Sequence, residues 1–157
     1  MLSEVCLVIP SKRKPPLSTL TNYGTWKHAT IIVADPEVYQ DHKQYYGGFD
    51  EIVIAEGVPG QGANKSLCYE IADKMGFKYF FRMDDDLAPK TFVGIAAGHY
   101  PYLDEVISEA FKCMEETETT LVGFHNGSNR YWMSNGYGRT YGLIHGGANL
   151  SVSVNDG

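Results

Sequence analysis

Three consecutive carboxylates, Asp84, Asp85 and Asp86, carry the strongest chemical signal in this sequence of 157 residues. They follow directly on the apolar segment 79–83, which is typical of a buried strand. Adjacent negative charges repel one another and require compensation. A divalent cation supplies it, and Mg²⁺ and Mn²⁺ accept carboxylate oxygens together with phosphate oxygens. Because alternate residues of an extended chain face the same side, we predict Asp84 and Asp86 as metal ligands. A solvated acidic turn is the alternative.

Further polar residues follow the first two predicted strands. The run Ser11-Lys12-Arg13-Lys14 comes after the first strand, and Asp35 comes after the second. The cations suit a diphosphate, and Asp35 either accepts hydrogen bonds from a nucleoside or closes a turn before a proline. In open parallel sheets, ligands bind beyond the carboxyl ends of the strands. These segments are therefore expected to lie near the aspartates, although each alone is also typical of an ordinary loop.

A glycine-rich turn, Gly60-Gln61-Gly62-Ala63-Asn64-Lys65, opens a predicted helix. Backbone N–H groups and the helix dipole favour an anion at such a position. The spacing matches neither the P-loop nor the dinucleotide-binding fingerprint. A simple turn with a helix cap explains the same residues.

Alternating strands and helices must position these residues. Strands are predicted at 4–10, 29–34, 51–55, 78–83 and 121–124, the first three as buried strands, and helices at 17–25, 37–46, 63–75 and 101–117. Strands separated by helical crossovers indicate a mostly parallel, Rossmann-like α/β sheet flanked by helices. In helix 63–75 an apolar face is expected, formed by Ala63, Leu67, Cys68, Ile71 and Met75, with Gly76 at its end. The Gly- and Tyr-rich segment 127–147 predicts short strands and loops that form a wall of a site.

Composition bounds the remaining possibilities. Hydrophobic residues make up 43% and charged residues 20%, as in a globular domain. The net charge of −6 argues against general electrostatic binding of duplex nucleic acid. The sequence lacks an apolar run long enough for a membrane span, a signal-peptide pattern, and a cysteine pattern typical of disulfides or zinc. A soluble, cytoplasmic protein is therefore expected.

Taken in order, the motifs resemble the nucleotide-sugar half of GT-A glycosyltransferases. The resemblance rests on Val8-Ile9-Pro10-Ser11, Asp35, Gly62-Ala63-Asn64-Lys65 and Phe80-Phe81-Arg82-Met83-Asp84-Asp85-Asp86. The general likeness is to the large family-2 group. A closer likeness is to the phage TET/JBP-associated glycosyltransferases, a group linked to hydroxymethylated pyrimidines in DNA. The likeness covers residues 5–87 well and 123–149 loosely.

This resemblance implies a metal-dependent glycosyltransferase. It would move a sugar from a nucleotide diphosphate sugar, with a UDP-sugar favoured, to an acceptor hydroxyl, which could belong to hydroxymethylated DNA. The implied cofactor is Mn²⁺ or Mg²⁺. Residues 1–157 would form one GT-A-like domain, with 1–87 binding the nucleotide sugar and 88–157 forming an acceptor-side half.

The same resemblance assigns roles to individual residues. Pro10, Ser11 and Asp35 would hold the nucleoside. Gln61, Asn64 and Lys65 would lie near the base and phosphates, with Lys12 as a further diphosphate contact. Asp85 would lie near the ribose or sugar, and Asp84 and Asp86 at the metal. The segment His145-Gly146-Gly147 would line the donor sugar.

The sequence departs from the family pattern at the catalytic base. Inverting members place a catalytic acid well beyond the glycine segment, whereas here Asp156 is the one late candidate and no base is assigned. A fragment of a longer chain and a different acid are both open explanations. Two alternative functions also remain: a nucleotidyltransferase using the same acidic site, and a non-catalytic nucleotide-sugar-binding module. The absence of glycine from loop 11–16 counts against the nucleotidyltransferase. A third possibility is an α/β domain whose acids bind only stray cations.

Overall fold

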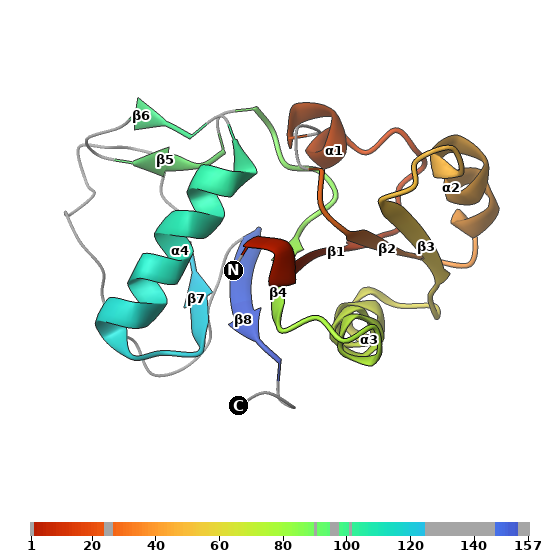
Figure 1. Cartoon of the computed structure of the whole chain (residues 1–157). Helices are drawn as coiled ribbons and strands as arrows, with labels where there is room; N and C mark the ends of the chain where they lie inside the picture. The colour runs from red at the N-terminus through yellow and green to blue at the C-terminus, as the bar shows by residue number, and fades with distance from the viewer. Residues whose placement is uncertain are drawn as a thin grey trace.

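The apolar segments form the strands of one six-stranded sheet in the computed structural model, which describes residues 2–23, 27–89, 91–94, 98–100, 102–124 and 147–153 (Figure 1). The strands are β1 (Val5–Ser11), β2 (Thr30–Ala34), β3 (Ile52–Glu56), β4 (Tyr79–Met83), β7 (Leu121–Gly123) and β8 (Ala148–Val152). Their spatial order is β3-β2-β1-β4-β8-β7. A separate pair, β5 (Val93–Gly94) and β6 (Gly98–His99), is antiparallel.

The first four strands of the main sheet run parallel. Each neighbouring pair among β3, β2, β1 and β4 is parallel, whereas β8 is antiparallel to both β4 and β7. The predicted mostly parallel α/β sheet is therefore confirmed. Strand β8 was not predicted, because only alternate positions in its first half are buried and its sequence has no continuous apolar run.

In the described part of the chain, four helices cover the two faces of the sheet. They are α1 (Ser18–Tyr23), α2 (Tyr39–Tyr46), α3 (Gln61–Lys74) and α4 (Leu103–Thr117), and a 3-10 turn, Leu2–Glu4, precedes β1. Helix α3 packs on one face against Cys6, Val8 and Phe80. The other face, which includes Leu7 and Phe81, packs against α1, α2 and α4 (Figure 1). Because side chains alternate across a strand, neighbouring residues of β1 and β4 supply both cores.

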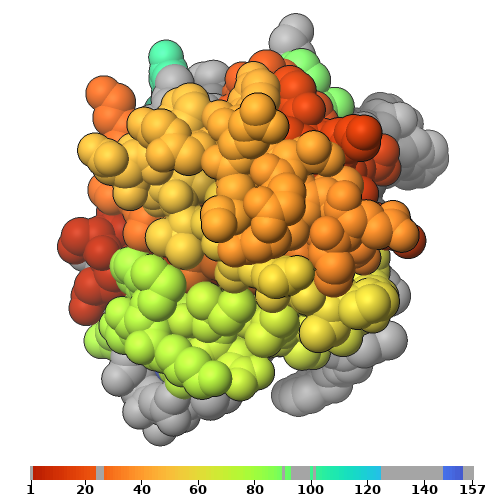
Figure 2. All heavy atoms as spheres, turned by 90° about the vertical axis from the view of Figure 1, so that its right-hand side faces the viewer, coloured from red at the N-terminus to blue at the C-terminus, as the bar shows by residue number. Residues whose placement is uncertain are grey.

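Two predicted burial patterns are wrong. β3 is an outer strand of the sheet and its Val53 is 41% exposed, so it is not a buried strand. Figure 2 looks onto the side of the molecule formed by α2, β3 and α3. The predicted apolar face of α3 is wrong in part. Cys68 is buried as predicted, and Leu67 and Ile71 pack partly buried against the core. Ala63 and Met75, which follows the helix, are exposed, whereas Asn64 and Ala72 are buried. A polar residue therefore lies within the buried face of this helix.

The end of α3 follows the prediction. Gly76 adopts a φ of +83° directly after the helix, and its N–H donates to the carbonyl oxygen of Asp73. A residue with a side chain is strained in this left-handed region, which explains why glycine suits the position.

None of the helices in the described part of the chain is long and apolar enough to cross a membrane.

The fold makes a direct prediction about stability at the centre of the sheet. Phe81 is fully buried, and its ring centroid lies 6.3 Å from that of Phe92 and 6.0 Å from that of Phe124. We expect Phe81→Ala to lower the free energy of unfolding by about 3–5 kcal/mol, measured by urea titration. Phe49, which is 49% exposed, provides the matched control. An equal loss in Phe49→Ala would contradict this core assignment.

Candidate functional site

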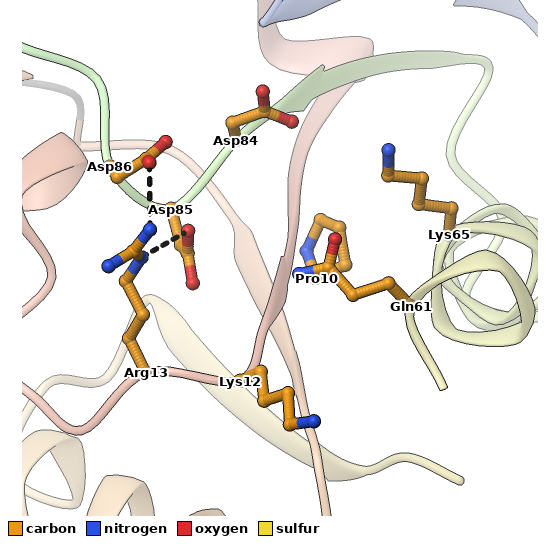
Figure 3. Close-up of a pocket in the computed structure, with 8 residues that line it drawn as sticks. All are labelled: Pro10, Lys12, Arg13, Gln61, Lys65, Asp84, Asp85 and Asp86. Carbon is orange, nitrogen blue, oxygen red and sulfur yellow. Dashed lines mark hydrogen bonds and ion pairs between the residues drawn. The ribbon is translucent and has the colours of Figure 1, made fainter. Parts of the chain in front are cut away.

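A pocket of about 470 Å³ lies at the carboxyl ends of β1 and β4, facing the first turns of α3 (Figure 3). Its lining consists of Pro10, Lys12, Arg13, Gln61, Lys65, Asp84, Asp85 and Asp86. β1 and β4 are parallel neighbours, so the residues that follow them lie side by side although more than seventy positions separate Ser11 from Asp85. The fold thus brings three segments singled out in the sequence to one pocket.

Asp84 is held by a buried arginine. Its carboxylate Oδ1 accepts a hydrogen bond from Nη1 of Arg82 at 3.0 Å, and the Arg82 side chain is only 9% exposed. With the Asn149 amide oriented to satisfy both of its neighbours, the amide oxygen accepts from Arg82 Nε at 3.0 Å and its nitrogen faces the Tyr69 hydroxyl at 3.1 Å. β8 thereby fixes the arginine that orients Asp84.

Gly147 lies directly beside Asp84. Its carbonyl oxygen accepts the Asp84 N–H at 2.7 Å. A Cβ at this position would lie 2.8 Å from Leu87 Cδ2 and 3.4 Å from Asp84 Oδ2. A side chain at this position would displace the end of the Leu87 side chain, and this member of the predicted small-residue segment does reach the acidic turn.

Asp85 turns inward and Asp86 turns outward. The Asp85 side chain is 8% exposed, and its Oδ2 accepts a hydrogen bond from the Ser11 hydroxyl at 2.8 Å. The Asp86 side chain is 51% exposed. Arg13 bridges the two, with Nε 3.3 Å from Asp85 Oδ1 and Nη2 3.0 Å from Asp86 Oδ2 (Figure 3).

The protein therefore supplies positive charge to the triplet itself. Arg82 pairs with Asp84, and Arg13 pairs with Asp85 and Asp86. A divalent cation is not the only available compensation, which corrects the reasoning from repulsion alone. Asp84 Oδ2 and Asp86 Oδ1 accept no hydrogen bond from any residue of the described ranges, so each carboxylate keeps one oxygen for another ligand.

Among the described residues, the acidic turn does not form a complete metal site by itself. Within the ranges that the structure describes, no three His, Cys, Asp or Glu side chains converge on a common point. A complete protein cage for a metal is thus missing from this part of the chain. Mg²⁺ commonly binds one or two carboxylates and completes its coordination with water and substrate phosphates. Asp84 and Asp86 suit that second arrangement.

Lys12 and Lys65 contribute positive charge to the pocket. Neither ammonium group has an ion-pair partner among the residues described. Lys65 extends from α3 toward the side of the pocket where Asp84 lies, and Gln61 lines the pocket one helical turn earlier (Figure 3). The combination of unpaired lysines and carboxylates can hold an anion and a cation together.

Helix α1 clamps the backbone that carries the aspartates. The Thr19 hydroxyl donates to the carbonyl oxygen of Asp84 and accepts from the Leu87 N–H at 2.8 Å. The Asn22 amide donates to the Leu87 carbonyl at 2.9 Å. These contacts fix the turn after β4 from the side opposite the pocket.

A buried histidine anchors the loop that carries Arg13. His42 on α2 is fully buried, and its Nε2 lies 2.8 Å from the Arg13 carbonyl oxygen, to which it donates. Its Nδ1 has no hydrogen-bond partner among the described residues. Burial lowers the pKa of His42, while the hydrogen bond to Arg13 and the negative charges of Asp85 and Asp41 oppose that shift.

Asn64 and Asp35 have local structural partners and do not line the pocket. Asn64 is 3% exposed; its Oδ1 accepts the Val58 N–H, and its Nδ2 donates to the Val58 carbonyl, both at 2.8 Å. Asp35 is 5% exposed, and its Oδ1 accepts the Glu37 N–H at 3.0 Å. Asn64 thus ties loop 57–60 to α3, and Asp35 closes the turn before α2.

Burial favours the protonated form of the cysteine thiols. Burial raises the pKa of both Cys6 and Cys68 to about 12. The pKa of Cys113 is also raised by burial. All three therefore remain protonated thiols near neutral pH.

Three predicted residues, His145, Gly146 and Asp156, lie outside the described residues. The described structure adds four residues to which the sequence prediction gave no individual role: Arg13, Thr19, His42 and Arg82. Arg82 had a visible signal, because a charged residue interrupts an otherwise apolar strand. Arg13 was part of the predicted basic run. Thr19 and His42 had no distinguishing pattern.

No family model matches the chain, and the search of curated proteins finds none that is similar.

The clamp from α1 predicts a selective loss of stability. Thr19→Val removes a fully buried hydroxyl that serves two backbone groups without a large change of shape. We expect the free energy of unfolding, measured by urea titration, to fall by about 1–3 kcal/mol. Thr21→Val is the matched control, since among the described residues the Thr21 hydroxyl bonds only to the carbonyl of Leu17, directly before α1. Similar losses in both variants would argue against the clamp.

The buried His42 predicts a stability that depends on pH. Its folded pKa is lowered, so the unfolded state binds its proton first as the pH falls. Stability should therefore decline below about pH 6.5, by at most about 1.4 kcal/mol per pH unit from this group. Urea titrations at pH 7.5 and 5.5 would measure the decline. His42→Phe lacks the titrating group, so it should lose less stability than the wild type between pH 7.5 and 5.5. If both proteins lose the same amount, the assignment to His42 is contradicted.

Proposed function

We propose that this chain is a GT-A-like glycosyltransferase domain that binds a nucleotide diphosphate sugar with Mn²⁺ or Mg²⁺ and transfers the sugar to an acceptor hydroxyl. One observation carries the proposal: carboxylates that follow β4 share a pocket with Lys12, which follows β1, and Lys65 of α3, neither of which has an ion-pair partner among the described residues. A pocket lined by both carboxylates and ammonium groups suits a metal–diphosphate pair better than it suits a neutral ligand. Its position at the carboxyl ends of parallel strands is where such folds bind ligands.

The residues of the pocket divide between metal and phosphate. Asp84 and Asp86 would hold the metal through their remaining carboxylate oxygens. Lys12 and Lys65 would bind the diphosphate oxygens, and the Gln61 amide can accept or donate a hydrogen bond nearby. When bound, the metal acts as a Lewis acid that stabilises negative charge on the diphosphate leaving group.

The protein contributes rigid positioning to this chemistry. Arg82 and the clamp from Thr19 hold Asp84, and Ser11 holds Asp85. Such groups do not need to reorganise when charge develops on the leaving group, which is the basis of electrostatic catalysis. The buried Asp85 is best suited to orient Arg13 rather than to contact a metal directly.

The acceptor belongs to the less specific part of the proposal. Gly147 packs closely against Asp84, and it is the described member of the segment that would line the donor sugar and acceptor. A hydroxymethylated DNA base is the acceptor implied by the family resemblance. The net charge of −6 favours a flipped or single base over extensive binding of duplex phosphates.

The first test is thermal stability with nucleotides and nucleotide sugars, each with and without Mn²⁺. A ligand that binds only the folded state adds about 2.7 kcal/mol of stability at 100 times its dissociation constant. We expect the midpoint to rise when UDP or a UDP-sugar and Mn²⁺ are present together. Asp86→Asn should abolish this joint effect, whereas Asp104→Asn on α4, which lies outside the pocket, should retain it.

The outcome separates the alternative functions. The absence of any stabilisation by a nucleotide would reject the glycosyltransferase proposal for this chain. Release of pyrophosphate from a nucleoside triphosphate and a sugar phosphate would indicate a nucleotidyltransferase instead. Joint binding of UDP-sugar and metal without hydrolysis or transfer would favour a non-catalytic binding module.

A further inference from the structure

Arg13 occupies an unusual position in the pocket, because its side chain is exposed while its backbone is fixed. The side chain is 63% exposed and contacts two carboxylates. Its backbone N–H donates to the Ser11 hydroxyl oxygen at 3.2 Å, and its carbonyl accepts from the buried His42 at 2.8 Å. The guanidinium can therefore change partners while the point from which it extends stays in place.

The two carboxylates that Arg13 contacts differ in freedom. Asp85 is nearly buried and tied to Ser11, so it cannot follow an incoming ligand. Asp86 is half-exposed, and Arg13 is its one ion-pair partner among the residues that the structure describes. Nε contacts Asp85 and Nη2 contacts Asp86, so the guanidinium can leave Asp86 and keep its contact with Asp85.

A divalent cation on Asp86 would compete with this contact. The Arg13 Nη2 atom lies 3.0 Å from Asp86 Oδ2, so a metal on the same carboxylate would bring two positive charges close together. Their repulsion is strong at such a distance unless a negative group lies between them. The phosphates of a nucleotide are that group.

We infer that Arg13 is an exchangeable counter-ion: it pairs with Asp86 in the absence of a divalent cation, and moves from Asp86 to a phosphate when metal and nucleotide bind together. This inference rests on the proposed function and deepens it. The exchange makes the metal bind weakly alone and more tightly with the nucleotide, because the displaced guanidinium gains a new partner only when phosphate is present. Metal and nucleotide affinities are then coupled in both directions.

The test is Mn²⁺ binding by the full chain, measured without UDP and with saturating UDP from the electron paramagnetic resonance signal of unbound Mn²⁺. Arg13→Gln removes the competing charge and the phosphate contact. We expect it to bind Mn²⁺ alone about threefold to tenfold more tightly than the wild type, and to show a smaller gain in Mn²⁺ affinity on addition of UDP.

Lys12→Gln is the matched control, since it removes one positive charge from the adjacent residue of the same pocket without breaking an ion pair to a carboxylate. It should leave binding of Mn²⁺ alone much closer to wild type than Arg13→Gln does. Arg13→Lys is a second variant that keeps the charge but loses the forked contact with both carboxylates. It should also bind Mn²⁺ alone more tightly than the wild type.

The possible outcomes distinguish a failure of the exchange at Arg13 from a failure of the proposed function. If Arg13→Gln and Lys12→Gln raise the affinity for Mn²⁺ equally, the effect is one of net charge and the exchange is rejected. If UDP and Mn²⁺ bind jointly and equally well to the wild type and both Arg13 variants, the exchange is rejected while the proposed function stands. If the wild type binds no Mn²⁺ even with UDP, both are rejected.

Discussion

The structure of the site depends on how three adjacent carboxylates are kept together at the end of one strand. Two arginines solve this problem from different directions: Arg82 lies within the same strand, and Arg13 comes from the loop after the neighbouring parallel strand. Asp85 then turns inward onto Ser11, while Asp84 and Asp86 each retain one carboxylate oxygen for a ligand. Charge compensation thus gives Asp85 a structural role, whereas Asp84 and Asp86 each keep a carboxylate oxygen that accepts no hydrogen bond from the described residues.

The surrounding elements hold that division in place. Helix α1 fixes the backbone after β4 through Thr19, and α2 fixes the loop of Arg13 through His42. In β8, the Asn149 amide oxygen accepts from Arg82, and Gly147, directly before β8, lies beside Asp84. Helix α1 therefore contacts the acidic turn directly, whereas α2 and Asn149 act on it through Arg13 and Arg82. A rigid turn of this kind suits the binding of a metal–diphosphate pair, whose geometry must be matched before reaction.

Much of the fold could be predicted because it follows local patterns. Continuous apolar runs identified β1, β2 and β4, and their alternation with helices indicated a mostly parallel sheet. The errors arose where burial depends on position in the sheet. β3 has the same apolar pattern as β2 but lies at the outer edge, and β8 has too few apolar residues to stand out. The sequence pattern does not record which strand has a neighbour on each side.

For the site, the sequence by itself determined which chemical groups follow the strands, and parallel pairing then required those groups to share one edge of the sheet. Lys12, Lys65 and the three aspartates therefore meet in one pocket. Only the tertiary structure decided which of the polar groups near the strand ends remain available to a ligand. Asn64 bonds to a neighbouring loop and Asp35 to its own turn, while Arg13 crosses to the aspartates. Hydrogen-bond partners depend on distances of about 3 Å between segments far apart in the chain, and no local pattern encodes those distances.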